Sequence, residues 1–73
     1  MQAFNQHITI DPNIRFGKHC VKGTRITVFD VLGYLSQGMS WEEIIHDFPE
    51  LTEENIKACL LFTAEKEQKI RIV

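Results

Sequence analysis

The strongest constraint on the fold is a helix-start pattern that occurs three times between residues 27 and 55. A Ser or Thr hydroxyl can accept a hydrogen bond from an unpaired backbone amide of the first helical turn, and a polar side chain three residues later can reach back to the cap. The cap and its partner are Thr27 with Asp30, Ser40 with Glu43, and Thr52 with Asn55. The third pair has an amide in place of the acid. The pattern predicts three helices that begin at residues 28, 41 and 53.

The spacing of apolar residues after each cap supports this prediction. In each segment they recur three or four residues apart, which places them on one face of a helix. These faces are formed by Val28, Val31, Leu32 and Leu35; by Trp41, Ile44, Ile45 and Phe48; and by Ile56, Cys59, Leu60 and Thr63. Gly38 suits the left-handed residue after a helix, and Pro49 stops the next one. We therefore expect a mainly α fold, a three-helix helix-turn-helix bundle of the homeodomain type, with these faces as its core.

Seventy-three residues are enough for a single domain only. Its expected parts are a basic arm at residues 1–26, the three-helix bundle at residues 27–68 and a tail at residues 69–73. Ile8 and Ile10 alternate with a polar residue, as do Ile70 and Ile72, so we expect a short strand near each end. The tail has two alternative roles: it pairs with residues 6–10 of its own chain or of a partner subunit, or it adds a strand to the sheet of a partner protein.

The third helix has a second apolar stripe beside the first, formed by Ala58, Leu61 and Phe62. A helix that is apolar over most of its circumference must be covered on two sides. Two flanking helices of the same chain can provide this cover, and so can a partner subunit. Because a chain of this length buries only about 60% of its unfolded surface, we expect a homodimer that uses these three residues.

The charges are divided unevenly along the chain. Residues 1–27 hold four basic residues and one acid, a net charge of +3, whereas residues 28–73 hold four basic residues and nine acids, a net charge of −5. In the first part, basic side chains and backbone amides near glycines suit phosphate oxygens. The candidate DNA-binding residues are Arg15, Lys18, Lys22, Thr24, Arg25 and, on the third helix, Lys57. The alternative is that Arg15 and Arg25 pair with the acidic part of the chain.

The sequence has no arrangement typical of a catalytic or metal site. The histidines and cysteines lack the paired spacing of zinc ligands, and nothing completes a catalytic triad. We therefore expect no enzyme activity, no metal, no other cofactor, and free thiols at Cys20 and Cys59. No apolar run approaches the roughly 18 residues of a membrane span, and the N-terminus lacks the pattern of a secretory signal. These features predict a cytoplasmic protein without a membrane partner.

A basic motif bounded by glycines gives the chain a family resemblance. The motif runs Gly17-Lys18-His19-Cys20-Val21-Lys22-Gly23-Thr24-Arg25-Ile26-Thr27-Val28. Shorter matching segments are Ile8–Pro12, Gly38–Ser40, Glu42–Ile45, Asp47–Pro49 and Leu51–Thr52. Over roughly residues 7–67 the chain resembles the family catalogued as domain of unknown function 433, in which position 19 is often Pro rather than His. The resemblance implies a short prokaryotic helix-turn-helix protein that acts as the antitoxin of a type II toxin–antitoxin pair, with a toxin that resembles the PIN-domain ribonucleases.

Two functions are compatible with these features. The first is a non-catalytic antitoxin that neutralises a PIN-like ribonuclease and, as a dimer, binds its own operator DNA. The second is a protein-interaction module that keeps the fold but has lost DNA binding. Glu53 and Glu54 open the helix that would enter the major groove, which favours the basic arm as the DNA contact. The toxin contact is expected in the tail, at Lys69, Ile70, Arg71 and Ile72.

Overall fold

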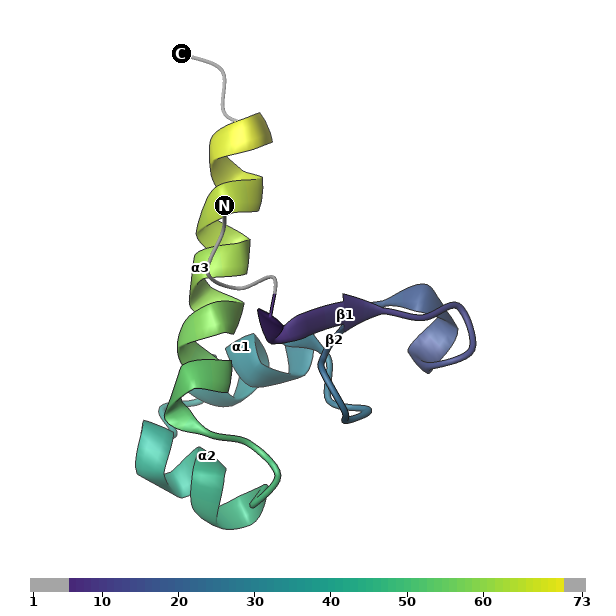
Figure 1. Cartoon of the computed structure of the whole chain (residues 1–73). Coiled ribbons are helices and arrows are strands. Elements are labelled where there is room, and N and C mark those ends of the chain that lie inside the picture. The colour runs from purple at the N-terminus through teal and green to yellow at the C-terminus, as the bar shows by residue number, and fades with distance from the viewer. Residues whose placement is uncertain (1–5, 71–73) are drawn as a thin grey trace.

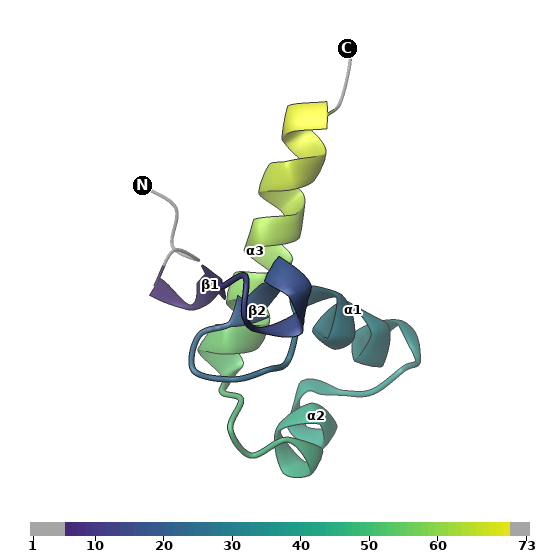
Figure 2. The ribbon, with the colours of Figure 1, turned by 90° about the vertical axis from the view of Figure 1, so that its right-hand side faces the viewer.

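The computed structural model describes residues 6–70, with side chains up to Lys66. Its elements are strand β1 (Ile8–Ile10), the 3-10 turn η2 (Arg15–Gly17), strand β2 (His19–Val21), helix α1 (Val28–Ser36), helix α2 (Trp41–Asp47) and helix α3 (Glu53–Ile70). Helices α1 and α2 pack against the N-terminal half of α3, and the β1–β2 hairpin projects from the same region (Figure 1). The C-terminal half of α3 extends beyond these elements in both views (Figure 2). The predicted three-helix, mainly α fold is confirmed.

All three predicted helix starts are confirmed, and each has both hydrogen bonds of the capping pattern. The amide nitrogens of Asp30, Glu43 and Asn55 donate to the hydroxyls of Thr27, Ser40 and Thr52 at 2.9, 3.1 and 3.2 Å. The reverse bonds, from the cap amides to the side-chain oxygens of the same partners, measure 3.0, 2.7 and 2.9 Å. At the start of α3, the side-chain oxygen of Asn55 therefore accepts the hydrogen bond that a carboxylate accepts at the other two helix starts.

The helix ends also follow local signals. Gly38 is left-handed, with φ +93°, and its amide donates to the carbonyl of Leu35 at 3.0 Å, which closes the turn after α1. Helix α2 ends at Asp47, two residues before Pro49. Glycine and proline therefore separate the helices as the sequence predicts.

The prediction of a C-terminal strand is wrong for the residues that the structure describes. Lys69 and Ile70 lie within α3, which is 18 residues long, rather than in an extended tail. No Gly or Pro interrupts this segment, and its Glu, Lys and Gln residues favour a helix. Arg71 and Ile72 lie outside the described residues.

Strand β1 was predicted correctly, but its partner lies within the basic arm. It pairs antiparallel with β2, in the register Ile8 with Val21, Thr9 with Cys20, and Ile10 with His19. Within the segment from Gly17 to Gly23, residues His19–Val21 form this strand. Both glycines are left-handed, with φ +80° and +81°, and they allow the chain to turn at each end of β2. The other edge of β1 is not paired within the described residues, and a pairing of residues 6–10 with residues 71–73 stays a prediction because the latter lie outside them.

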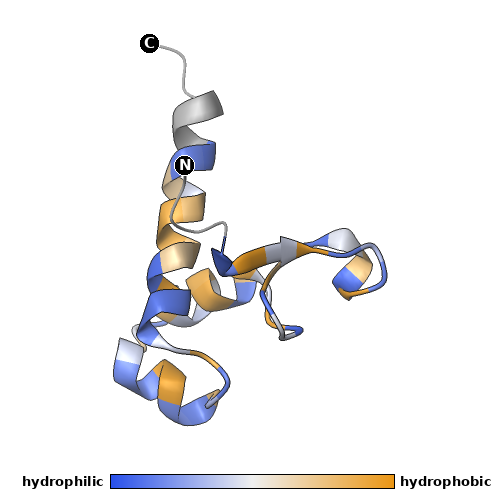
Figure 3. Ribbon diagram, in the orientation of Figure 1, coloured by the Kyte–Doolittle hydropathy of each residue, from blue (hydrophilic) through white to orange (hydrophobic). Residues whose placement is uncertain are grey.

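The core lies where the three helices meet the hairpin. Its fully buried side chains are Val21, Val31, Ile44, Leu51, Ile56 and Cys59. Burial raises the pKa of the Cys59 thiol to about 11, so this residue packs as a small apolar side chain. Leu60, predicted on the core face, is 38% exposed, whereas Ala58 is buried. Apolar residues of α3 lie midway along the helix, near α1 and the hairpin (Figure 3). Within residues 6–70, no helix is long and apolar enough to cross a membrane.

Candidate interaction surfaces

The turn that ends the hairpin is held by one arginine. In η2, Arg15, Phe16 and Gly17 are all left-handed, with φ +51°, +59° and +80°. The guanidinium of Arg15 donates to the carboxylate of Asp30 at 3.1 Å and to the carbonyl of Arg25 at 2.9 Å. These contacts tie η2 to the start of α1. The prediction that Arg15 pairs with an acid of the bundle is therefore confirmed for this residue.

A second turn, around Gly23, positions two cations. The Thr24 hydroxyl donates to the carbonyl of Val21 at 2.9 Å and accepts from the amide of Ile26 at 3.0 Å. This hydroxyl thus both donates and accepts a hydrogen bond within the turn. Lys22 and Arg25, on either side, are exposed. The turn can present two positive charges to an anionic surface.

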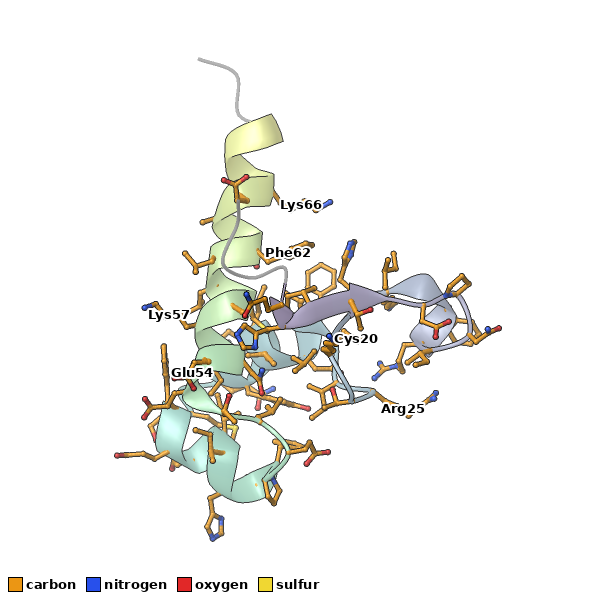
Figure 4. The ribbon with its side chains drawn as sticks, in the orientation of Figure 1. Cys20, Arg25, Glu54, Lys57, Phe62 and Lys66 are labelled. Carbon is orange, nitrogen blue, oxygen red and sulfur yellow. The ribbon has the colours of Figure 1, made fainter. Side chains whose placement is uncertain are left out.

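The six candidate DNA-binding residues do not form one surface. Arg15 is held in its ion pair, and Thr24 is held in its turn. Lys57 projects from α3 on the side opposite to Arg25 (Figure 4). The exposed cations on the hairpin side are Lys18, Lys22 and Arg25. They form a smaller basic surface than the sequence predicts.

A groove lies between the start of β2, helix α1 and helix α3, with a volume of about 350 Å³. Its lining is mostly apolar and includes Val28, Phe29, Leu32, Phe62 and Thr63, with Lys18, His19 and Lys66 beside them. The rings of His19 and Phe62 are 4.6 Å apart, and the ammonium of Lys66 lies 5.4 Å from the centre of the Phe62 ring. Phe62 and Lys66 point to the same side of α3 (Figure 4). We call this hollow the groove.

Two members of the groove were missed by sequence reasoning. Phe29 follows the first residue of α1 and is 77% exposed, which is unusual for a large aromatic side chain. Its position off the core face of the first helix was the available signal. His19 pairs with Ile10 across the hairpin and contacts α3. Burial, and then the positive charge of Lys66, lower the pKa of His19.

The predicted dimer residues lie in three different environments. Ala58 is 2% exposed within the single chain, whereas Phe62 lines the groove. Leu61 is 40% exposed and lies with Leu60 and Ala64 on a face of α3 that points away from the core. We call these last three residues the outer face of α3. Of the predicted toxin-binding residues, Lys69 and Ile70 are in α3, and Arg71 and Ile72 are outside the described part of the chain.

Two acidic residues open α3, the helix that a helix-turn-helix protein would place in the major groove of DNA. Glu53 and Glu54 form the first turn of α3 and are exposed. A second acidic surface lies on α2, where the carboxylate of Asp47 is 3.4 Å from His46. Among the described residues, no three His, Cys, Asp or Glu side chains are grouped so as to hold a metal ion. Base contacts from the start of α3 are therefore disfavoured by charge.

Comparison with known proteins assigns the family. The family described as "Protein of unknown function (DUF433)" matches residues 8–63, which is more than half of the chain. The chain belongs to the DUF433 family. The resemblance noted in the sequence is thereby confirmed. The matched region of this DUF433 protein contains the hairpin, α1, α2 and the part of α3 up to Thr63.

One curated relative and one solved structure illustrate the relationship. The uncharacterized protein y4eO of Sinorhizobium fredii (strain NBRC 101917 / NGR234) is 31% identical over 62 residues, which are 85% of this chain and 28% of y4eO. The chain thus spans under a third of the length of that relative. The crystal structure of a DUF433 member from Anabaena variabilis ATCC 29413 matches with a TM-score of 0.80 and 28% identity, over 94% of this chain and 68% of that chain. This chain therefore shares its fold with that DUF433 member, and the description of the family names no function.

Proposed function

We propose that this DUF433 protein is a non-catalytic protein-interaction module that acts as an antitoxin and neutralises a PIN-like ribonuclease by binding it. The enzyme class of the partner comes from the family resemblance. Support for a binding role comes from the outer face of α3, where Leu60 and Leu61 are exposed on a helix that extends beyond the rest of the fold (Figure 1).

The spacing of this face suits a partner protein. Ala64 follows Leu60 by four residues and Leu61 by three, so these three side chains lie on one side of the helix. A helix with apolar residues at this spacing can lie in a hydrophobic groove of a partner, where a few side chains act as anchors. Because the core of this chain does not need these residues, they remain available for such a contact.

The Leu61→Glu variant tests this function. We expect it to bind and inhibit the PIN-like ribonuclease encoded beside its gene at least about thirtyfold more weakly, the effect of losing one anchor residue. RNA cleavage is measured with purified ribonuclease at increasing concentrations of the full-length chain. Gln37→Glu adds the same charge at an exposed site after α1, and it should leave inhibition unchanged. Equal inhibition by Leu61→Glu and the unmodified chain contradicts this assignment, as does a ribonuclease that the unmodified chain does not inhibit.

Operator binding is the second candidate function, and one observation favours it. Lys22 and Arg25 are both exposed around the Gly23 turn, and Lys18 is exposed at the other end of β2. Together they place three positive charges per chain on the hairpin side. The hairpin, and not the acidic start of α3, is the element suited to contact phosphates.

The salt dependence of the affinity for operator DNA tests whether the hairpin contacts phosphates. Lys18 lines the groove, so the count rests on Lys22 and Arg25. Two cations per chain give four per dimer, and the slope of log affinity against log salt for operator DNA should be no steeper than about −4. The Lys22→Ala, Arg25→Ala double variant should bind more weakly and give a flatter slope in fluorescence anisotropy titrations. Lys57→Ala removes a cation on the other side of α3 and should change neither value. If Lys57→Ala weakens binding as much as the double variant does, the hairpin is not the contact surface.

A further inference from the structure

The end of the hairpin presents a phenyl ring to water. Phe16 is 98% exposed, and its backbone is left-handed. Bulky residues rarely adopt this conformation, and such strain persists where surrounding contacts enforce it, often at binding sites. The turn is closed by the amides of Gly17 and Lys18, which donate to the carbonyls of Ile14 and Arg15 at 3.1 and 3.2 Å. The Arg15 guanidinium then ties the turn to Asp30 and to the carbonyl of Arg25. The fold therefore holds an aromatic side chain outward in a fixed place.

The groove is of the right kind to receive such a side chain. Its volume of about 350 Å³ is at the low end of the range of roughly 300–1,000 Å³ for ligand sites, so it suits a side chain better than a large cofactor. Phe29, Leu32 and Phe62 give it an apolar lining. An inserted ring can pack edge to face against the aromatic side chains of this lining.

The charges around the ring and the groove are complementary. Lys18 and Lys66 line the groove, and Asp11 lies on the loop that leads from β1 to η2. Among side chains that the structure describes, the ion pairs are Arg15 with Asp30 and His46 with Asp47, so these three charges are not neutralised by pairs. The Asp11 carboxylate accepts a hydrogen bond from the amide of Asn13 at 2.9 Å. A hairpin end that enters the groove of another molecule brings a carboxylate towards its lysines.

The ring and the groove are also adjacent in each molecule. Lys18 and His19, which line the groove, follow Phe16 by two and three residues. Ile10, which is 56% exposed, pairs with His19 and shares its face of the hairpin, so it extends the apolar surface from the groove towards the hairpin end. In a two-fold pair, the same contact can then form twice and leave no open binding site.

We propose that two copies of this chain form a closed dimer by exchanging hairpin ends, with Phe16 of each copy seated in the groove of the other. This dimer does not use the outer face of α3, so it goes beyond the antitoxin function and is independent of it. It differs from the dimer predicted from the sequence, because it requires Phe62 but neither Ala58 nor Leu61.

Sedimentation velocity of the full chain tests the exchange. The unmodified chain should be a dimer at high micromolar concentration. Phe16→Asn removes the ring, and Asn tolerates a left-handed backbone, so the variant should keep or raise the melting temperature. Its dimer dissociation constant should rise by roughly a thousandfold. Each dimer loses two Phe16 anchors, and the loss of each anchor weakens the affinity about thirtyfold. Asp11→Asn keeps the hydrogen bond to Asn13 but not the charge, and it should weaken the dimer several-fold.

A mixing experiment shows whether the ring and the groove are partners. Phe29→Asp removes an aromatic wall of the groove and places an acid in the first turn of α1, where it is favourable for the helix. Alone, Phe29→Asp and Phe16→Asn should each be monomers. When mixed, they should form a heterodimer in native mass spectrometry, because one supplies the intact groove and the other supplies Phe16. This single contact should give an affinity between those of the unmodified chain and of either variant.

Leu61→Glu is the control variant, and it also tests whether the dimer forms through the outer face of α3 instead. It alters the outer face of α3 and should leave the dimer intact. A Phe16→Asn protein that still dimerises with unchanged affinity overturns the proposal, as does an unmodified chain that sediments as a monomer. Two variants that remain monomers when mixed also overturn it. A dimer lost in Leu61→Glu but kept in Phe16→Asn assigns the interface to the outer face instead.

Discussion

The Ile56→Ala variant is expected to melt about 10–30 °C below the unmodified chain. Ile56 is completely buried in the first half of α3, at the centre of the cluster formed by the helices and β2. Truncation to alanine loses the transfer energy of three carbon atoms and leaves a cavity, which together cost about 2–5 kcal/mol. Domains of this size are stable by roughly 4–11 kcal/mol in total. Much of the free energy of unfolding should therefore be lost.

Thermal unfolding followed by far-ultraviolet circular dichroism measures this loss. Leu60→Ala is the matched control, because it removes the same number of carbon atoms one turn along α3 from a side chain that is 38% exposed. It should lower the melting temperature by only a few degrees. Equal losses in the two variants contradict the assignment of Ile56 to the core and Leu60 to the outer face of α3.

The helix starts are predictable because their partners are close in sequence. Each cap interacts with a residue three positions later, so the bonds of Thr27, Ser40 and Thr52 depend on local backbone geometry alone. The same holds for the glycine after α1. These signals fix where helices begin and end, and the apolar spacing then fixes which face of α1 and α2 is buried.

The hairpin is less predictable because its contacts are distant in sequence. Strand β2 forms through pairing with β1, and the paired residues are 9 positions apart for Ile10 with His19 and 13 for Ile8 with Val21. Its basic residues conceal the apolar pattern of a strand. The left-handed Phe16 lies in a turn that is tied to the bundle by an ion pair between Arg15 and Asp30, which are 15 residues apart. A non-glycine residue carries no sequence signal for such a conformation.

The two apolar stripes of α3 show the same limit. Periodicity places Ala58, Leu61 and Phe62 near each other on the helix, but it cannot say which neighbour covers each residue. The fold buries Ala58, turns Phe62 towards His19 and leaves Leu61 exposed. The groove arises because the start of β2 crosses α3 beside α1, and this crossing is a property of the tertiary fold.

The Asp30→Ala variant is expected to be less stable by about 2 kcal/mol, or roughly 10 °C in melting temperature. The carboxylate of Asp30 accepts from the amide of Thr27 at 3.0 Å and from the guanidinium of Arg15 at 3.1 Å. Thr27 is 2% exposed, so its amide loses its acceptor in a place with little access to water. Because the pair with Arg15 is partly exposed, it adds little to the total. The variant also frees Arg15, so the turn that holds Phe16 should become mobile.

The pH dependence of stability separates the charge of Asp30 from its hydrogen bonds. Burial alone raises the pKa of this carboxyl, but the bonds from Thr27 and the contact with Arg15 outweigh burial and hold the pKa below its ordinary value of 3.8. A carboxyl with a lowered pKa in the folded state stabilises the fold above its unfolded pKa, and this contribution is lost as pH falls through the folded pKa. Asp30→Asn should therefore be less stable than the unmodified chain at neutral pH, and the difference should shrink below about pH 4. Asp47→Asn, at an exposed acid on α2, should match the unmodified chain at both pH values in urea unfolding. A difference for Asp30→Asn that is the same at neutral and acid pH shows that the charge of Asp30 does not stabilise the fold.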